Sequence, residues 1–454
     1  MLVELRGSGL EELKILTSAR ELLEKGEVLD VTWYREKLYV AGKPDKWQNC
    51  VAADTRGRLV NSTGSVLDGG VFDGSISMAG GRPLAAILGD GSVVTWGLGF
   101  SGGDSRSVRD KLKNVLQIQA TVNAFAAILG DGSVVTWGLA NAGGDSSEVR
   151  DQLKNVQQIQ ATSGAFAAIR GDGSVVAWGD ADFGGDISAV RDQLNTVQQI
   201  QATRHAHESF TDSAAFAAIL GDGSVVTWGG ASSGGDSSEV RDQLKNVQQV
   251  QATSHAFAAI LGEGSIVTWG DAGWGGDSSV VRGQLNNVQQ IQATERAFAA
   301  ILRDGSVVTW GEAFSGGDDS AVRGQLNNVQ QIQGTSLAFA AILGNGSVVT
   351  WGNAGFGGDS SAVRDQLTSV QQIQSTYAAF AAILADGSVV TWGRAAMGGD
   401  SSAVRDKLRN VQQIQASAQA FAAILSDGSV VTWGHGLSGG DSSAVRDQLN
   451  CNYA

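Results

Sequence analysis

AFAAIRGDGSVVAWG, residues 165–179, places two apolar runs on either side of an Asp-Gly dipeptide. This arrangement is the strongest short-range sequence signal for a β-hairpin. The stretch recurs along the chain, and its Trp-Gly pair begins at Trp96, Trp137, Trp178, Trp228, Trp269, Trp310, Trp351, Trp392 and Trp433. Successive tryptophans are 41 residues apart, except at the third interval, which is 50. The chain is therefore a tandem array of nine repeats.

One complete repeat, residues 155–194, shows the expected elements. A first strand begins at Val156, and the two runs of the hairpin follow. After Trp-Gly comes a loop that varies between copies, then Gly-Gly-Asp. Asp186–Leu194 is expected to be a short helix, with Asp or Ser at its N-cap and Val190 and Leu194 on one face. Each unit is thus predicted to hold three antiparallel strands and a short helix.

The turn of the hairpin varies little. It is Asp-Gly in most copies, Asn345-Gly346 in one and Glu263-Gly264 in another. Asn in place of Asp is what a turn residue with positive φ would tolerate, so we expect that geometry.

Comparing the copies also identifies core positions. A phenylalanine recurs eight times, with Leu84 in the first copy, at Phe125, Phe166, Phe216, Phe257, Phe298, Phe339, Phe380 and Phe421. The paired alanines that follow it, such as Ala167 and Ala168, indicate that neighbouring sheets approach closely. A unit of this size cannot bury its own apolar face, so neighbouring units must stack.

Composition excludes several classes of protein. The net charge of −14 and the lack of a basic stretch argue against nucleic-acid binding and against adsorption to anionic membranes. The N-terminal residues lack the apolar core of a signal peptide, and no apolar run approaches 18 residues, so we expect neither secretion nor membrane insertion. An intracellular, cytoplasmic protein is the default.

The two cysteines lie near opposite ends of the chain. A disulfide bond between Cys50 and Cys451 could join the two ends, but free thiols are the favoured interpretation.

The array is flanked by other segments. Residues 1–45 are expected to form a strand and helix that cap the array, and residues 46–70 form a degenerate repeat. The nine repeats occupy residues 71–450, with Val71–Met78 standing in for the first strand of the first copy. Residues 451–454 are a short tail.

The repeat motif resembles that of the regulator of chromosome condensation family. The resemblance rests on an apolar strand, Asp-Gly, a strand such as Ser224–Gly229 (SVVTWG), a variable loop and Gly-Gly-Asp, and it covers roughly residues 71–450. It implies a β-propeller that serves as a protein-binding platform. Some members of the family are guanine-nucleotide exchange factors, and others are adaptors or parts of ubiquitin ligases.

The chain departs from the family pattern in three ways. Family repeats are longer and have a fourth strand where this chain has the expected helix, and Gly-Gly-Asp replaces the customary Gly-Gln-Leu-Gly. Nine copies also exceed the usual seven blades. The predicted fold is therefore mainly β with short helices, a propeller-type array of about nine blades. Its geometry is an enlarged ring, a ring with extra repeats or an open superhelical solenoid.

Two residue series recur in every copy. The Asp of Gly-Gly-Asp could form a ring of cation ligands, but capping of the helix explains it. The series is Asp104, Asp145, Asp186, Asp236, Asp277, Asp318, Asp359, Asp400 and Asp441. An arginine in each expected helix could bind anions, but ion pairs with the carboxylates of the neighbouring repeat are the preferred interpretation. These arginines are Arg109, Arg150, Arg191, Arg241, Arg282, Arg323, Arg364, Arg405 and Arg446.

No motif for catalysis, nucleotide binding or zinc is present, so we expect neither an enzyme nor a cofactor. His205, His207 and Glu208 resemble part of a metal site, but no other His or Cys is placed to complete it. No metal site is therefore predicted.

The copies disagree in two sets of loops, and loops on a rigid scaffold commonly carry binding residues. In the loops after Trp-Gly, the candidate contacts are Phe100, Phe183, Trp274, Phe314, Phe356 and Met397. In the insert of the fourth copy, Arg204–Ser213, they are Arg204, His205, His207, Glu208 and Phe210. Alternatively, the aromatic residues after Trp-Gly fill the rim of each blade.

The sequence therefore predicts a non-catalytic scaffold or adaptor for a protein partner, which could be a subunit of a larger assembly. One alternative is a nucleotide-exchange factor for a small GTPase, and another is a lectin whose aromatic loops stack on sugars.

Overall fold

A computed structural model describes residues 28–34, 37–42, 52–53, 59–60, 84–87, 91–96, 99–203 and 213–443. Near the N-terminus, β1 (Val28–Tyr34) pairs antiparallel with β2 (Lys37–Gly42), and β3 (Ala52–Ala53) pairs with β4 (Leu59–Val60). No helix in the described part of the chain is long and apolar enough to cross a membrane.

The nine repeats, here called units 1 to 9 in chain order, each contribute one sheet. The first strands of units 2 to 9 are β7 (Val115–Ala120), β10 (Val156–Ala161), β13 (Val197–Ala202), β16 (Val247–Ala252), β19 (Val288–Ala293), β22 (Val329–Gly334), β25 (Val370–Ser375) and β28 (Val411–Ala416). The second strands of units 1 to 9 are β5 (Leu84–Ile87), β8 (Ala124–Leu129), β11 (Ala165–Arg170), β14 (Ala215–Leu220), β17 (Ala256–Leu261), β20 (Ala297–Leu302), β23 (Ala338–Leu343), β26 (Ala379–Leu384) and β29 (Ala420–Leu425). The third strands are β6 (Val93–Trp96), β9 (Val134–Gly138), β12 (Val175–Gly179), β15 (Val225–Gly229), β18 (Ile266–Gly270), β21 (Val307–Gly311), β24 (Val348–Gly352), β27 (Val389–Gly393) and β30 (Val430–Gly434).

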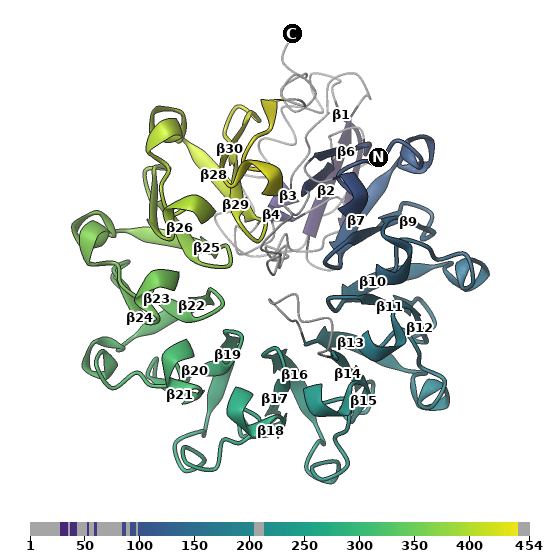
Figure 1. Ribbon diagram of the computed structural model, residues 1–454, viewed down its shortest axis with the longest axis horizontal. Coiled ribbons are helices and arrows are strands. Elements are labelled where there is room, and N and C mark those ends of the chain that lie inside the picture. Colours follow the sequence, from purple (N-terminus) through teal and green to yellow (C-terminus); the bar gives the residue numbers. More distant parts are fainter. Residues whose placement is uncertain are drawn as a thin grey trace.

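The three strands of each unit pair in sequence order. Units 2 to 9 form three-stranded antiparallel sheets, and the described strands of unit 1, β5 and β6, form a two-stranded one. The sheets are arranged around a central axis, with the first strands innermost and the third strands farther out (Figure 1). The predicted mainly β, propeller-type array of three-stranded units is confirmed.

The hairpin between the second and third strands forms where the sequence predicts it, but its turn differs from the prediction. In unit 2, Gly132 has a φ of 78°, whereas Asp131 is not among the residues with positive φ. The Asp131 carboxylate instead accepts hydrogen bonds from the backbone nitrogen of Ser133 at 2.9 Å and from its hydroxyl at 2.6 Å. Asn345 makes the same two bonds to Ser347, which explains why Asn replaces Asp without a change of fold.

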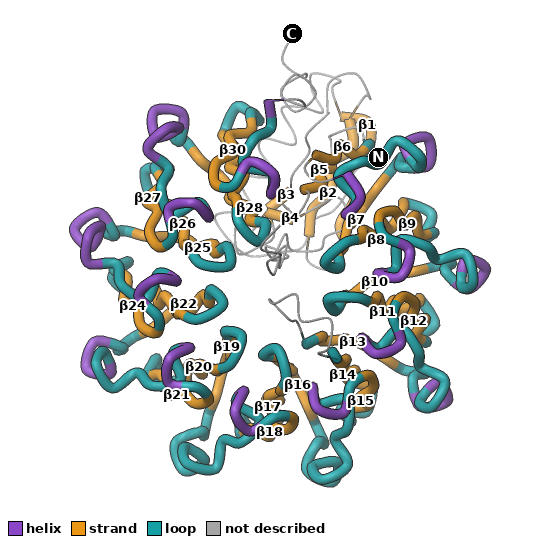
Figure 2. Tube along the Cα trace, in the orientation of Figure 1, coloured by secondary structure: helices purple, strands orange, loops and turns teal. Residues whose placement is uncertain are grey.

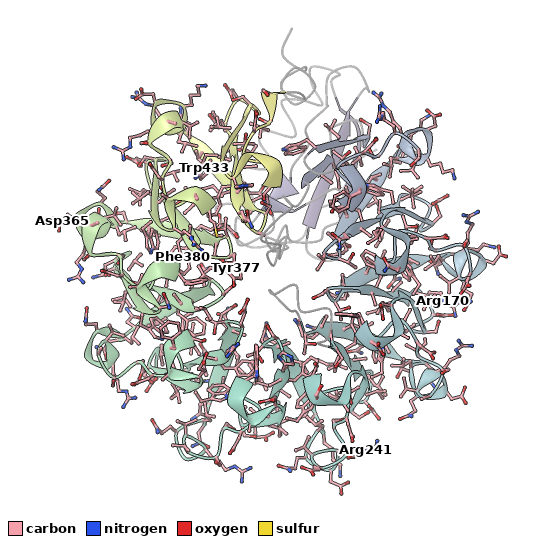
Figure 3. All side chains as sticks on the ribbon, viewed as in Figure 1. Arg170, Arg241, Asp365, Tyr377, Phe380 and Trp433 are labelled. Atoms are coloured by element: carbon pink, nitrogen blue, oxygen red, sulfur yellow. The ribbon has the colours of Figure 1, made fainter. Side chains whose placement is uncertain are left out.

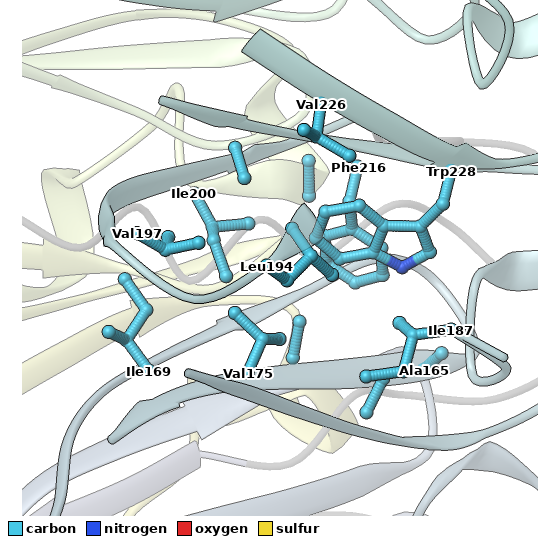
Figure 4. Packing of buried hydrophobic residues seen from close by; sticks show 14 residues of the cluster. Ala165, Ile169, Val175, Ile187, Leu194, Val197, Ile200, Phe216, Val226 and Trp228 are labelled. Atoms are coloured by element: carbon cyan, nitrogen blue, oxygen red, sulfur yellow. The ribbon is translucent and has the colours of Figure 1, made fainter. Parts of the chain in front are cut away.

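The hydrophobic core lies between successive units. Phe216 and Trp228 of unit 4 pack against Ala165, Ile169 and Val175 of unit 3 (Figure 4). The small alanines allow this approach, because Ala167 and Ala168 are fully buried. Within eight units the recurrent Phe lies beside the recurrent Trp, with ring centroids 5.1–5.2 Å apart. Such ring pairs contribute about 0.5–1.5 kcal/mol each beyond the area they bury.

One hydrogen bond joins each unit to the one before it. The indole nitrogen of the recurrent Trp donates to the carbonyl of the first glycine of Gly-Gly-Asp in the preceding unit. The nine bonds, 2.9–3.2 Å long, are Trp137–Gly102, Trp178–Gly143, Trp228–Gly184, Trp269–Gly234, Trp310–Gly275, Trp351–Gly316, Trp392–Gly357, Trp433–Gly398 and Trp96–Gly439. The last of them joins unit 1 to unit 9. Unit 9 therefore lies beside unit 1, and the units follow one another around a central axis (Figure 1).

A larger residue at either glycine of Gly-Gly-Asp would cause a steric clash. A Cβ at Gly184, where φ is 91°, would lie 2.7 Å from the Phe216 ring. A Cβ at Gly185 would lie 2.5 Å from the carbonyl oxygen of Gly179. The first glycine of the motif is therefore explained by packing between units, and the second by packing within its own unit.

The short helix predicted after Gly-Gly-Asp is present in six of the described units as a 3-10 helix, and the i, i+4 spacing expected of an α-helix is wrong. Its residues form turns and 3-10 helices at the outer tips of the ring (Figure 2), which are η2 (Arg109–Lys111), η4 (Arg150–Gln152), η6 (Arg191–Gln193), η10 (Arg323–Gln325), η12 (Ser361–Gln366) and η14 (Ser402–Lys407). In unit 3, Val190 and Leu194 donate backbone hydrogen bonds to residues three positions earlier, Ile187 and Arg191. A nine-residue α-helix has little stability of its own, and the buried Leu194 side chain anchors the segment without it.

Candidate functional site

The two sets of variable loops form one surface. In unit 5, the Thr253 hydroxyl, at the end of the first strand, donates to the Trp274 carbonyl in the loop after Trp-Gly at 2.9 Å. The backbone nitrogen of Asp271 donates to the His255 carbonyl at 2.9 Å. Corresponding bonds recur around the ring, so the loop after each Trp-Gly is fixed beside the loop between the first two strands. We call this surface, formed by both sets of loops, the loop face.

A one-turn 3-10 helix forms in every loop after Trp-Gly. These turns are η1 (Gly99–Ser101), η3 (Ala140–Ala142), η5 (Ala181–Phe183), η7 (Ala231–Ser233), η8 (Ala272–Trp274), η9 (Ala313–Ser315), η11 (Ala354–Phe356), η13 (Ala395–Met397) and η15 (Gly436–Ser438). Most of them end at a glycine with positive φ, such as Gly275 at 91°. The loops thus share one backbone conformation and differ in their side chains.

The candidate residues after Trp-Gly separate into two groups. Phe100 and Phe314 are at the second residue of their 3-10 turns and are 65% and 63% exposed. Phe183, Trp274, Phe356 and Met397 are at the third residue and are half-buried. Phe183, Trp274 and Phe356 pack against the core between units. The structure therefore leaves Phe100 and Phe314 for contacts with other molecules, whereas the second group also contributes to folding.

Trp274 lies at the centre of a stack that involves two units. The His255 ring centroid is 4.0 Å from that of Trp274, and the Arg296 guanidinium carbon, from unit 6, is 4.0 Å from the Trp274 centroid. Arg296 also forms a 3.4 Å ion pair with Glu312. A cation over an indole ring is favourable, so this stack holds Trp274 in place.

A second aromatic pair lies on the loop face between units 7 and 8. The centroid of Phe356 is 5.3 Å from that of Tyr377, and the rings meet edge to face. Burial raises the pKa of Tyr377 well above its usual value, and the nearby Glu295 charge raises it further. Figure 3 labels Tyr377 and the nearby Phe380, which lie on the side of the ring opposite Arg170.

Sequence reasoning did not select His255, Arg296, Glu312, Tyr377 or Arg394. All five lie in the two variable loop sets, so the disagreement between copies marked their positions. The repeat pattern does not indicate which loop residues meet across a boundary between units. The insert candidates Arg204, His205, His207, Glu208 and Phe210 lie outside the described residues, as do Cys50 and Cys451.

The recurrent Asp of Gly-Gly-Asp stabilises a turn. In unit 2, Asp145 accepts a 2.9 Å hydrogen bond from the backbone nitrogen of Ser147, and this bond lowers the pKa of Asp145. Asp104 also forms an ion pair with Arg106, and the side-chain hydrogen bond from Arg106 is the largest cause that lowers its pKa to about 2. Within the described ranges, no three His, Cys, Asp or Glu side chains are grouped so that they could hold a metal ion.

The expectation for the recurrent arginines is wrong over the described units. Arg323 pairs with Asp319 of its own unit at 2.6 Å, rather than with a neighbouring unit. The other arginines of the series that the structure describes form no ion pair; Arg241, for example, points outward from its tip (Figure 3). The tips extend radially, which separates their charges from those of the next unit.

No family model matches the chain, and neither does any curated protein. Among solved structures, Prp20p from Saccharomyces cerevisiae is 17% identical, with a TM-score of 0.36 and coverage of 61% of this chain and 82% of that one. Yeast RCC1 (Prp20) bound to Kap60 is 16% identical, with a TM-score of 0.39 and coverage of 69% and 80%. The computationally designed Ika8 protein is 12% identical, with a TM-score of 0.33 and coverage of 71% and 96%.

The matches thus include a yeast protein named for the family that the repeat motif resembles. TM-scores this low carry no argument about function. The sheets and the hydrogen bonds between units define the fold.

Proposed function

We propose that the ring is a non-catalytic scaffold that binds a protein partner through its loop face. The observation that supports this most is where the units differ. The Phe–Trp pair and the alanines recur in the core, whereas the exposed aromatic side chains that differ between units lie in the loops of this face. A repeat needs its core residues to fold, but folding does not require an exposed phenylalanine.

Phe100 and Phe314 are the first candidates for partner contacts. Both are more than half exposed, and exposed aromatic side chains are frequent anchors in protein interfaces. Phe183, Trp274, Phe356 and Met397 are proposed as secondary contacts because part of each side chain reaches solvent. The insert candidates in residues 204–210 remain part of the proposal.

Affinity capture from cell extract, read by quantitative mass spectrometry, tests this function. The test variant is F100A/F314A, which leaves the core intact. The matched control is D131N/D304N, on the opposite face, where Asn345 shows that Asn is accepted. Partners that are lost with the first variant and retained by the second support the proposal. Partners that bind both variants equally contradict it.

Two extensions refine the result. A form that lacks residues 204–212 tests the insert, and unchanged partners would remove it from the proposal. If a captured partner is a small GTPase, its rate of nucleotide release with and without the ring decides between an adaptor and an exchange factor.

A further inference from the structure

The first residue after Trp-Gly has a recurring structural role. Polar side chains at this position turn back onto their own loop. Asp180 accepts a hydrogen bond from the backbone nitrogen of Asp182, Asp271 from Gly273, and Asn353 from Gly355, at 2.7–2.9 Å. Glu312 accepts one from the Ser315 hydroxyl, and His435 lies 3.4 Å from the Ser438 hydroxyl. The polar residues at this position therefore have a role in folding, because they stabilise the conformation of their own loop.

Arg394 occupies the same position in unit 8 and has no such role. Its guanidinium cannot accept a hydrogen bond, and within the described part of the chain it forms neither a side-chain hydrogen bond nor an ion pair. The side chain is exposed. Only its backbone is engaged, through a 2.8 Å bond from its nitrogen to the Ala378 carbonyl.

Unit 6 shows how an arginine at these loops is normally satisfied. There the backbone nitrogen of Glu312 donates to the Arg296 carbonyl. The equivalent bond in unit 8 runs from the backbone nitrogen of Arg394 to the Ala378 carbonyl. In unit 6 the two side chains beside this bond form an ion pair at 3.4 Å. In unit 8 the arginine lies beside an alanine, so the position of a carboxylate partner is empty.

The surroundings of Arg394 are apolar and aromatic on one side. Its charge acts on Tyr377, whose pKa it lowers against the larger effect of burial, and Tyr377 lies against Phe356. Met397 is half-buried in the same loop. The other charged groups that act on Tyr377 are Glu295, which is half-buried, and Arg296, which is paired with Glu312. Arg394 is therefore the exposed cation of this area that lacks an ion pair.

We propose that Arg394, with Phe356, Tyr377 and Met397 beside it, binds an aspartate or glutamate side chain that is flanked by apolar residues in the partner protein. This rests on the proposed function and assigns a point of contact within the loop face. The carboxylate forms charge-assisted hydrogen bonds with the guanidinium. The flanking apolar side chains cover the ring edges and the thioether. The exposed guanidinium also favours the approach of an acidic segment to this part of the loop face.

Short synthetic peptides test the proposal without knowledge of the partner. One set holds a central Asp or Glu between Leu and Phe, and a matched set replaces the acid with Asn or Gln. Binding to the full chain is measured by fluorescence polarisation at low and at physiological salt. Acidic peptides are expected to bind about tenfold more tightly than their amides, which corresponds to about 1.4 kcal/mol. The advantage should diminish as salt increases.

The variant R394A should abolish this preference. R241A is the matched control, because it removes the same charge from an exposed arginine on an outer tip. Thermal unfolding of both variants should match that of the wild type. The proposal is overturned if neither peptide set binds, if amides bind as well as acids, or if R394A and R241A behave alike. Should F100A/F314A lose captured partners while R394A retains the peptide preference, the scaffold function stands and the assignment of Arg394 fails.

Discussion

The indole nitrogen of Trp96 donates a 3.2 Å hydrogen bond to the carbonyl of Gly439, 343 residues away in sequence. At the other eight boundaries the same bond lies beside a continuous chain that passes from one unit to the next. The boundary between units 9 and 1 is also less tightly packed, because Ala422 and Ile424 are half-buried, whereas their counterparts Ala381 and Ile383 are buried. We therefore expect this boundary, which we call the seam, to be the weakest place in the ring.

The substitution W96F should open the seam. It removes a hydrogen bond whose net value is about 0.5–1.5 kcal/mol, together with part of a buried ring. Hydrogen–deuterium exchange should increase in β5, β6, β29 and β30 and change little elsewhere. The control W269F removes the same bond at an internal boundary, where exchange should increase less. Equal local increases in the two variants would show that the seam is no weaker than the other boundaries.

The strands could be predicted because their cause is local. Two apolar runs around Asp172-Gly173 specify a hairpin in any unit, and pairing of Phe166 with Trp178 follows from it. The role of Gly184 could not be predicted in this way, since the ring it contacts, Phe216, belongs to the next unit. Closure is likewise a property of nine units together, because it depends on small rotations between them that no single repeat encodes.

Other parts of the prediction failed for identifiable reasons. The spacing of Val190 and Leu194 fits an α-helix, but successive i to i+3 turns place Leu194 in the core equally well. In the loops, the variation between copies located the candidate surface correctly. It could not distinguish Asp271, whose side chain caps its own loop, from Arg394, whose side chain does not.

Unit 3 differs from most units at two contacting positions, and we expect the effects of substitutions at these positions on stability to depend on each other. In most units a threonine hydroxyl on the third strand bonds to a serine hydroxyl after Gly-Gly-Asp, as Thr227 does with Ser237 at 3.0 Å. Unit 3 has Ala177 and Ile187 at these positions, and both are buried. A177T should cost about 1–3 kcal/mol of unfolding free energy, because its larger side chain must fit into a core that already holds the buried Ile187. The double variant A177T/I187S should recover most of this loss in chemical denaturation, whereas additive costs would argue against the coupling.

Asp319 is the acidic variant of that same serine position, and it should be a site of easy stabilisation. The residue is 1% exposed, and its Oδ2 atom has no hydrogen-bond partner, although Oδ1 pairs with Arg323. D319S would place a serine hydroxyl beside the Thr309 hydroxyl. The two could then form the hydrogen bond that Thr268 and Ser278 form in unit 5. The gain should be about 1 kcal/mol, measured as a higher denaturant midpoint, because the pair with the exposed Arg323 contributes little. A lower midpoint would mean that the ion pair outweighs the unsatisfied oxygen.

The two groups of loop aromatics should differ in their effect on folding. F314A should change the unfolding free energy by less than about 0.5 kcal/mol, because the side chain is exposed. F356A should cost about 1–3 kcal/mol, since Phe356 packs against the core and against Tyr377. Thermal denaturation of both variants makes the comparison. Similar losses in the two would show that exposure does not separate these loop positions.

The turn carboxylates should make the ring sensitive to acid. Hydrogen bonds from the hydroxyl and backbone of Ser306 lower the pKa of Asp304 below its ordinary value of 3.8, and the same occurs at Asp131, Asp172, Asp222, Asp386 and Asp427. Because the folded-state pKa is depressed, this stabilisation is present above the unfolded value of about 3.8 and is lost as pH falls through the folded value. The unfolding temperature should therefore decrease as the pH is lowered below about 4. D304N reproduces the turn of Asn345 and should remove part of this pH dependence while leaving stability at neutral pH nearly unchanged. An unfolding temperature that falls equally steeply in D304N and in the wild type would assign the acid sensitivity to other carboxylates.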